Sequence, residues 1–194
     1  MKTPSVYTPL ERSFFERPTD IVARQLCGKI LVRQFDGVLM AGMITETEAY
    51  FGEDDPASHA ARGPTERSAH FWGPGGISYV YLIYGMHNCL NVIAEPEQTP
   101  GAVLIRAMEP LAGIDFMAAN RKTSRPFDIC SGPAKLCQAL NIDRSLNKID
   151  MTDENSPIYI ASGATEDFEI CVTPRIGIKK AAERLLRFYI VRVL

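Results

Sequence analysis

The sequence lacks the residues on which several classes of protein depend. It has three histidines and five cysteines among 194 residues, and no CxxC or HExxH motif occurs. We therefore expect no metal site, because these residues are the usual transition-metal ligands. The number of cysteines is odd and none are paired by spacing, which predicts reduced and mostly buried thiols instead of a disulfide framework.

Long apolar runs are also absent. No run approaches the roughly 18 to 20 residues that a membrane helix needs. The segment Met1 to Ser5 is polar and has no apolar signal core. We therefore expect a cytoplasmic protein without a secretion signal or a membrane partner. An apolar share of 46 % and a charged share of 23 % are typical of a globular chain, and the length suits one domain over residues 1–194.

The balance of charge is slightly acidic. A formal net charge of −2 argues against a protein whose whole surface binds nucleic acid. Acidic residues gather in 46–55 and 143–169. Basic residues could still share one face, and the candidates are Arg62, Arg67, Arg106, Arg121, Lys122, Arg125, Lys135, Arg175, Lys179 and Lys180.

Hairpin signals organise the first half of the chain. Lys29–Phe35 and Val38–Tyr50 are predicted strands joined at Asp36-Gly37, a strong two-residue turn. Residues 51–76 are rich in glycine, proline and charge, which predicts a long loop that is either functional or disordered. Tyr79–Ile83 and Cys89–Ile93 predict a second hairpin, with a protruding tip at residues 84–88.

The other elements are short. Helices are predicted at Ile21–Cys27, Ala112–Arg121 and Ala134–Leu140, and strands at Gly101–Met108, Ile158–Ala161, Phe168–Val172 and Leu186–Val191. Strands outnumber helices, and hairpins link most of them. The prediction is an α+β fold: a single compact domain with a mostly antiparallel, barrel-like sheet and a protruding β-hairpin.

Two carboxylates are the first candidates for chemistry. On a regular strand Glu46, Glu48 and Tyr50 would share one face with Ile44. Repulsion between two carboxylates tends to raise the pKa of one of them, which is how a general base near neutrality is made. An exposed strand face with two solvated acids is the commoner source of this pattern, and the pattern alone does not exclude it.

The aromatic hairpin is the second candidate. Tyr79 is most simply a core residue. Tyr84, if the chain turns at Gly85, would lie exposed at the tip, where it could wedge into a stack of bases. An inward-facing Tyr81 could be a platform for a base.

A loop and a helix start offer weaker signals. His59 could return to the neighbourhood of Glu48, although loop histidines such as His70 are more often solvated or structural. Ser131-Gly132-Pro133-Ala134-Lys135 combines free N–H groups at a helix start with a cation, which suits a phosphate. Ordinary helix capping explains that segment equally well.

Taken in order, these segments resemble one family, the 3-methyladenine DNA glycosylases of the alkyladenine (methylpurine) type. The matching segments run over most of the chain: 23–29, Glu46-Thr47-Glu48-Ala49-Tyr50, His59 with Arg62-Gly63, 79–87 with Asn91, 101–110, 131–140 and Pro174-Arg175-Ile176-Gly177. Ser68 departs from the asparagine usual there, which puts the hydrogen bonding of that loop in doubt.

The resemblance implies roles for individual residues. Glu48 would activate the hydrolytic water, and Arg106 would help to hold it. Tyr84 would fill the space left by a flipped nucleotide, and Asn91 would disfavour guanine by crowding its 2-amino group. The base would stack between Tyr50, His59 and Tyr81. The expected DNA contacts are the hairpin residues Met86 and His87 and, less firmly, Lys135 and Arg175 with phosphates.

The resemblance also implies a reaction and a partner. The partner would be double-stranded DNA with a damaged purine, bound by a monomer in the bacterial nucleoid or a nucleus. Hydrolysis would leave an abasic site, with no lyase step and no cofactor. Two alternatives stay open: a noncatalytic nucleic-acid-binding module, and a metal-dependent hydrolase that uses Glu46, Glu48 and His59.

Overall fold

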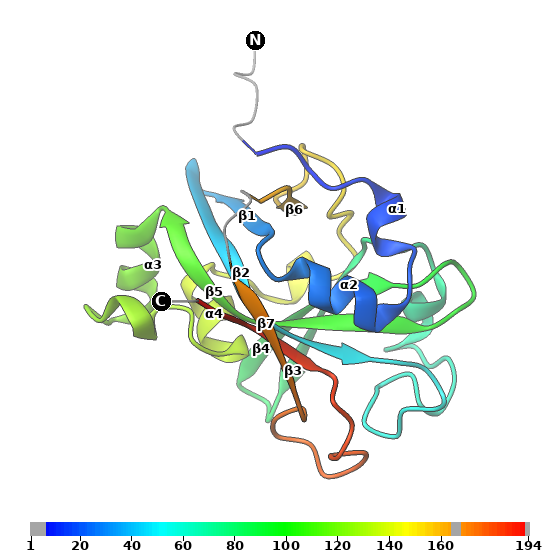
Figure 1. Ribbon diagram of the computed structural model, residues 1–194. Helices are drawn as coiled ribbons and strands as arrows, with labels where there is room; N and C mark the ends of the chain where they lie inside the picture. Colours follow the sequence, from blue (N-terminus) through cyan, green and yellow to red (C-terminus); the bar gives the residue numbers. More distant parts are fainter. Residues whose placement is uncertain (1–6, 164–167, 193–194) are drawn as a thin grey trace.

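A strongly curled antiparallel sheet forms the body of the protein, and helices cover its flanks (Figure 1). The computed structural model describes residues 7–163 and 168–192. Six strands follow the order β3-β4-β5-β2-β1-β6, and β8 joins β2 and carries β7. Their bounds are Ile30–Phe35 (β1), Val38–Tyr50 (β2), Ser78–Ile83 (β3), His87–Ala94 (β4), Gly101–Ala112 (β5), Ile158–Ala161 (β6), Glu169–Thr173 (β7) and Arg187–Val191 (β8). The predicted α+β, antiparallel and barrel-like fold is confirmed.

Short helices complete the described structure. They are α1 (Arg12–Phe15), α2 (Thr19–Leu26), α3 (Ile114–Arg121) and α4 (Pro133–Ala139), with 3₁₀ turns at Ala69–Trp72, Pro126–Asp128 and Arg144–Leu146. Helix α2 buries one face, including Val22 and Leu26, against the sheet. The four residues of α1 are too few to produce a periodic signal, so the sequence did not predict this helix.

Strand β5 continues further than predicted. It runs to Ala112, where the sequence predicted the start of a helix. Helix α3 begins only after Gly113, whose φ of 70° turns the chain. The boundary moves because β2 is long enough to pair with β5 as far as Ala112.

Strand β2 is the element that positions the site. It pairs with β1 near its start, with β5 along its length, and with β8 at Glu46, Thr47 and Glu48. Register shifts occur between Ile44 and Glu46 and between Glu46 and Thr47. Such irregularities re-aim side chains. The prediction that Ile44 shares a face with both carboxylates is therefore wrong, and Ile44 packs instead in the main core.

The long loop 51–76 folds over β3, β4 and β5 and has a small core of its own. Phe71 from the loop packs with Tyr79 and Ile93 from the sheet. Tyr79 is buried, as predicted. Ser68 accepts a hydrogen bond from the backbone N–H of Thr65 and donates one to the Gly63 carbonyl, so serine fulfils the local bonding that its departure from the family pattern put in doubt.

All five cysteines are free thiols, and four of them are buried. None of the helices in the described ranges is long and apolar enough to cross a bilayer.

Candidate active site

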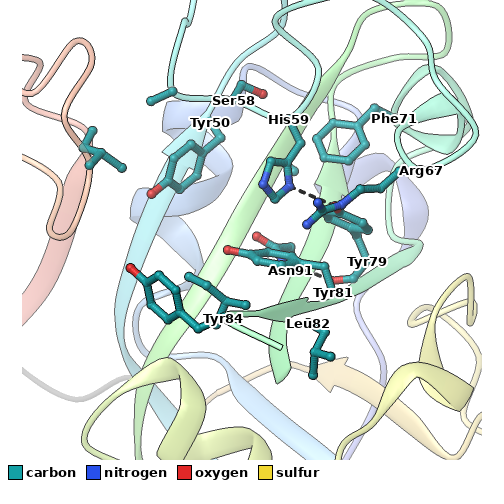
Figure 2. A pocket seen from close by; sticks show the side chains of 14 residues that line it. Tyr50, Ser58, His59, Arg67, Phe71, Tyr79, Tyr81, Leu82, Tyr84 and Asn91 are labelled. Carbon is teal, nitrogen blue, oxygen red and sulfur yellow. Dashed lines mark hydrogen bonds between the residues drawn. The ribbon is translucent and has the colours of Figure 1, made fainter. Parts of the chain in front are cut away.

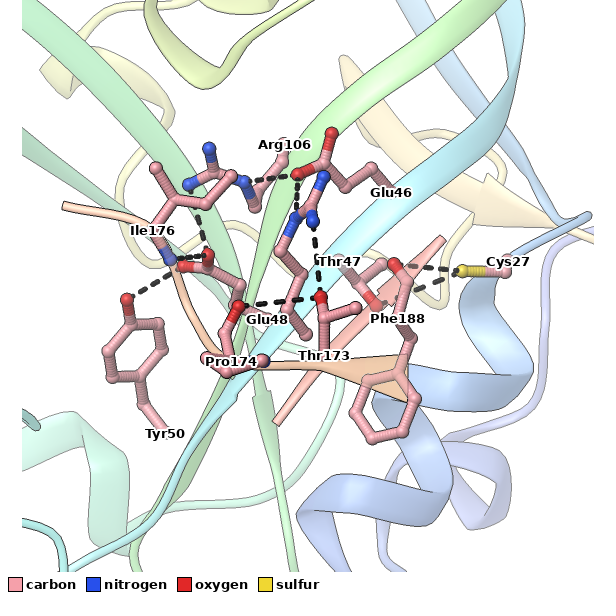
Figure 3. Close-up of polar contacts among 11 residues, drawn as sticks. Cys27, Glu46, Thr47, Glu48, Tyr50, Arg106, Thr173, Pro174, Ile176 and Phe188 are labelled. Carbon is pink, nitrogen blue, oxygen red and sulfur yellow. Dashed lines mark hydrogen bonds and ion pairs between the residues drawn. The ribbon is translucent and has the colours of Figure 1, made fainter. Parts of the chain in front are cut away.

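Glu48 is a buried carboxylate with a full set of donors. Its side chain has no exposed surface. The backbone N–H of Ile176 donates to Oε1 at 2.7 Å, and the Tyr50 hydroxyl donates to Oε2 at 2.8 Å (Figure 3). Arg106 adds an ion pair, with 3.3 Å between its guanidinium and Oε1. A buried carboxylate is tolerated when a cation and hydrogen bonds compensate for lost hydration.

Glu46 holds two arginines in place beside Glu48. Its Oε1 accepts from Arg106 Nε and from Arg187 Nε, each at 2.6 Å. Burial alone would raise the pKa of Glu46, but the hydrogen bonds from Arg187 and Arg106 outweigh it and hold that pKa below its usual value. The prediction that repulsion raises a carboxylate pKa is therefore wrong for Glu46, because arginines separate the two acids.

Arg106 bridges the two acids. Burial opposes its charge, yet Glu48 and Glu46 together raise the pKa of Arg106 above its ordinary value. The side chain is therefore a permanent cation that neutralises part of the charge of the pair. The pairing of Arg106 with Glu48, which the family resemblance implied, is present in the structure.

An aromatic cavity of about 410 Å³ lies beside this cluster. Its volume is within the range of small-molecule sites. The four residues predicted to hold a base, Tyr50, His59, Tyr81 and Asn91, all line it (Figure 2). The His59 and Tyr81 rings lie edge to face, with centroids 4.6 Å apart. The rest of the lining comes from the 51–76 loop, the hairpin, the sheet and the segment between β7 and β8: Ala57, Ser58, Arg67, Phe71, Tyr79, Leu82, Ile83, Tyr84, Ala102 and Ile178.

Tyr50 connects the cavity to the carboxylate. Glu48 does not line the cavity, but Tyr50 does, and its hydroxyl reaches Glu48 (Figure 3). Burial and the neighbouring Glu48 charge raise the pKa of Tyr50, so the hydroxyl keeps its proton and remains a donor. Glu48 therefore lies directly behind the wall of the cavity.

The hairpin tip beside the cavity is exposed. Tyr84 has 82 % of its surface accessible and Met86 has 70 %. Tyr84 and Gly85 have φ values of 53° and 71°, and the Met86 N–H donates to the Ile83 carbonyl, which is the geometry of a type I′ turn. The turn raises Tyr84 out of the hairpin, as predicted, and His87 beside it is also exposed.

The amino-acid sequence of the chain is similar to the sequences of known proteins. The model of the methylpurine-DNA glycosylase (MPG) family matches residues 13–193. The chain belongs to the methylpurine-DNA glycosylase family. Similar relatives are provisionally named 3-methyladenine DNA glycosylases: one from Koribacter versatilis is 45 % identical over 94 % of this chain and 89 % of its own. One from Methanocella arvoryzae is 47 % identical over 92 % and 88 %, and one from Clostridium tetani is 46 % identical over 93 % and 95 %.

In this member of the methylpurine-DNA glycosylase family Arg175 is not a surface residue. Its side chain is fully buried and forms a two-pronged ion pair with Asp55, at 2.5 and 2.8 Å. It also donates to the Ala49 carbonyl. A guanidinium enclosed in this way does not reach a phosphate, so we withdraw the predicted phosphate contact. Arg175 instead fixes the segment whose next residue, Ile176, donates to Glu48.

The other predicted phosphate contact, Lys135, lies on α4 and pairs with Asp128 on the surface. Its contact with DNA remains a prediction. The proposed basic face also loses members, because Arg106 and Arg175 are engaged in ion pairs inside the protein. The basic residues that remain available for a positive surface are therefore fewer than the sequence suggested.

Arg187 and the Ile176 backbone are functional groups that sequence reasoning missed. Arg187 lies on β8 directly opposite Glu48 on β2. These strands are about 140 residues apart in the chain, as the 141-residue separation of Glu46 and Arg187 shows. No local pattern reports such a pairing. The family motif Pro174 to Gly177 was the one signal that could have pointed to Ile176.

A metal centre finds no support in the geometry. Within residues 7–163 and 168–192, no group of three or more histidine, cysteine, aspartate or glutamate side chains could hold a metal ion. Glu46 and Glu48 are bonded to arginines, and His59 is bonded to Tyr79. The alternative of a metal-dependent hydrolase built on these residues is therefore wrong.

Proposed function

We propose that the protein is a monofunctional DNA glycosylase, acting as a monomer, that hydrolyses the N-glycosidic bond of a damaged purine in double-stranded DNA. The observation that carries this proposal is one arrangement: a fully buried, donor-held carboxylate, Glu48, lies directly behind an aromatic cavity. The rim of that cavity bears an exposed tyrosine, Tyr84. The family of the chain supports the same reaction class.

The hairpin tip suits nucleotide flipping. A base inside a duplex cannot be reached, so the nucleotide must leave the stack at a cost of a few kcal/mol, which is least for damaged or mispaired bases. Tyr84 is exposed and lies at the cavity rim, so it would enter the duplex as the nucleotide leaves. Met86 and His87 would contact the groove beside it.

The cavity suits a flat purine. The base would lie between Tyr50 on one side and His59 and Tyr81 on the other, all three of which line the cavity. Aromatic faces attract alkylated purine cations as well as neutral rings. Asn91 would crowd the 2-amino group of normal guanine. The substrate class is 3-methyladenine, as the names of the relatives suggest, together with 7-methylguanine, hypoxanthine or ethenoadenine.

Glu48 would be the general base. A water that replaces the Tyr50 hydroxyl at Oε2 would lie between the carboxylate and the flipped nucleotide. Glu48 would take its proton and stabilise the positive charge that develops on the sugar. Arg106 forms an ion pair with the carboxylate and would help to hold this water beside it. The described groups that bond to Glu48 include no lysine, so a Schiff-base lyase step has no nucleophile there.

Single-turnover excision tests this function. Three duplexes, each with one hypoxanthine, ethenoadenine or 7-methylguanine, are incubated with the protein and then treated with hot alkali. We expect strand breaks that appear only after alkali, on at least one duplex. Breaks before alkali would contradict the monofunctional assignment. No breaks on any duplex, and no base released from methylated genomic DNA, would favour the noncatalytic binding module.

A further inference from the structure

Tyr79 lines the cavity and bonds to two of its other lining residues. Its hydroxyl accepts a hydrogen bond from Arg67 Nε at 2.9 Å. The same oxygen is 2.8 Å from Nδ1 of His59 (Figure 2). The side chain is 2 % exposed and packs in the small core with Phe71. The hydroxyl therefore has two partners, and both come from the long loop.

The chemistry of these groups fixes the direction of each hydrogen bond. Arg67 Nε–H can only donate. Tyr79 has one hydroxyl hydrogen, and the other group bonded to it is His59 Nδ1. If His59 donated instead, the buried tyrosine hydrogen would have no acceptor, which carries a free-energy penalty. Tyr79 therefore donates to Nδ1, and His59 accepts there.

This direction sets the tautomer of His59. An imidazole that accepts at Nδ1 is neutral and carries its hydrogen on Nε2. Figure 2 shows the second ring nitrogen of His59 on the side of the ring that faces Tyr50 across the cavity. The cavity therefore presents one fixed N–H donor between its aromatic walls.

Further contacts fix both Arg67 and Tyr79. The Arg67 guanidinium also lies over the Tyr81 ring, 5.1 Å from its centroid. The turn that contains Arg67 is closed by the hydrogen bonds of Ser68 with Thr65. Tyr79 sits in the regular pairing of β3 with β4. A hydrogen-bond donor fixed in this way is preorganised for its ligand.

We propose that Tyr79, oriented by Arg67, is a positioning residue that fixes the tautomer of His59: the ring stays neutral, accepts at Nδ1 and presents its Nε2–H to the cavity. The use of this ring to hold a flipped base rests on the glycosylase function proposed above, but the test of the tautomer does not.

The tautomer is measured by long-range proton–nitrogen NMR of histidine rings. The chain has three histidines, and a His59→Gln variant assigns the signal. We expect wild-type His59 to show an unprotonated Nδ1 and a protonated Nε2. In Tyr79→Phe and Arg67→Met this single pattern should give way to a mixture of tautomers. The opposite tautomer in the wild type, or an unchanged spectrum in both variants, would overturn the proposal.

The NMR measurement and the excision assay on wild-type protein separate the two hypotheses. If wild-type protein excises no lesion but His59 has the expected tautomer, the proposed function fails while the role of Tyr79 in fixing the ring stands. If lesions are excised but the tautomer is the opposite one, the inference fails alone.

Discussion

Charged side chains inside the protein depend on a few neighbours, and Arg175 with Asp55 is the most enclosed pair. Both side chains have no exposed surface. Asp55 also accepts from the backbone N–H groups of Phe51 and Ala57, so the pair ties the start of the long loop to the segment that carries Ile176. The burial of this pair gives it a structural role in holding the donor to Glu48.

Removing one partner of this pair should be costly. Arg175→Met leaves the Asp55 charge uncompensated in the interior, and we expect a loss of about 3–5 kcal/mol in the free energy of unfolding. Denaturant unfolding measures it. Arg192→Met is the matched control, since its pair with Glu109 is about half exposed and should contribute about 1 kcal/mol or less. Similar small losses in both variants would contradict the structural role of Arg175.

Asn91 is the residue proposed to reject normal guanine. It is 4 % exposed, lines the cavity, and donates to the Tyr79 carbonyl at 3.1 Å. Asn91→Ser shortens the side chain, so we expect excision of guanine-type bases to rise about tenfold, as when one steric contact in a pocket is removed. Excision of hypoxanthine in the same assay is the internal control. An unchanged substrate spectrum would contradict the proposed role of Asn91 in rejecting guanine.

At the scale of elements, the β3–β4 hairpin holds the residue at its tip in an unusual backbone conformation. Tyr84 occupies a backbone region that non-glycine residues seldom adopt, at φ 53°. Such strain is held only where the surrounding structure imposes it. Here the two paired strands impose it, and the result is an aromatic ring held away from the protein.

Tyr84→Ala should weaken binding to lesion DNA without destabilising the fold. Stacking of an aromatic side chain on a base contributes about 1–3 kcal/mol, so we expect affinity to fall about tenfold or more. Phe127→Ala is a matched control, because Phe127 is a 95 % exposed aromatic outside the cavity. Both affinities are measured by fluorescence anisotropy. Equal affinity of Tyr84→Ala and wild type would exclude the proposed insertion of Tyr84 into the stack of bases.

The elements show what a sequence can and cannot predict. The turn at Asp36-Gly37 and the tip at Tyr84-Gly85 were predictable, because each contains a glycine, which adopts positive φ freely, and each lies between apolar runs. The bulges between Ile44 and Thr47 were not, because they lie where one edge of β2 changes its partner from β1 to β8 while β5 stays paired on the other edge. Family motifs pointed to seven residues that the structure brings together, Glu48 and Arg106 with Tyr50, His59, Tyr81, Asn91 and Tyr84. The contacts of Arg187 and Tyr79 could not be predicted, because only the folded chain creates them.

At the scale of the whole molecule, two partly desolvated histidine rings, those of His59 and His70, link stability to pH. Burial, assisted by Arg67, lowers the pKa of His59 to about 4, and burial with Lys148 does the same for His70. Neither ring nitrogen of His70 has a hydrogen-bond partner among the described contacts. Both residues therefore resist protonation in the folded state, whereas in the unfolded chain they titrate near 6.5.

Stability should therefore fall as the pH drops from 6.5 toward 4. In that window the unfolded chain binds protons that the folded protein does not, which favours unfolding. Thermal unfolding midpoints across this range measure the effect. His70→Phe, which keeps a ring against Phe71 and Tyr79, should flatten the curve. A midpoint that is constant from pH 7 to 5 would contradict the lowered pKa values of these two rings.

The central claim is that Glu48 activates water for glycosidic hydrolysis. The most direct test is the single-turnover excision rate of Glu48→Gln, with Glu109→Gln as a matched control on an exposed acid. General-base catalysis contributes about 10²–10⁴-fold, so we predict a loss of at least about 100-fold in Glu48→Gln alone, with binding to abasic-site DNA retained. A folded Glu48→Gln variant that excises the lesion at near the wild-type rate would contradict the account.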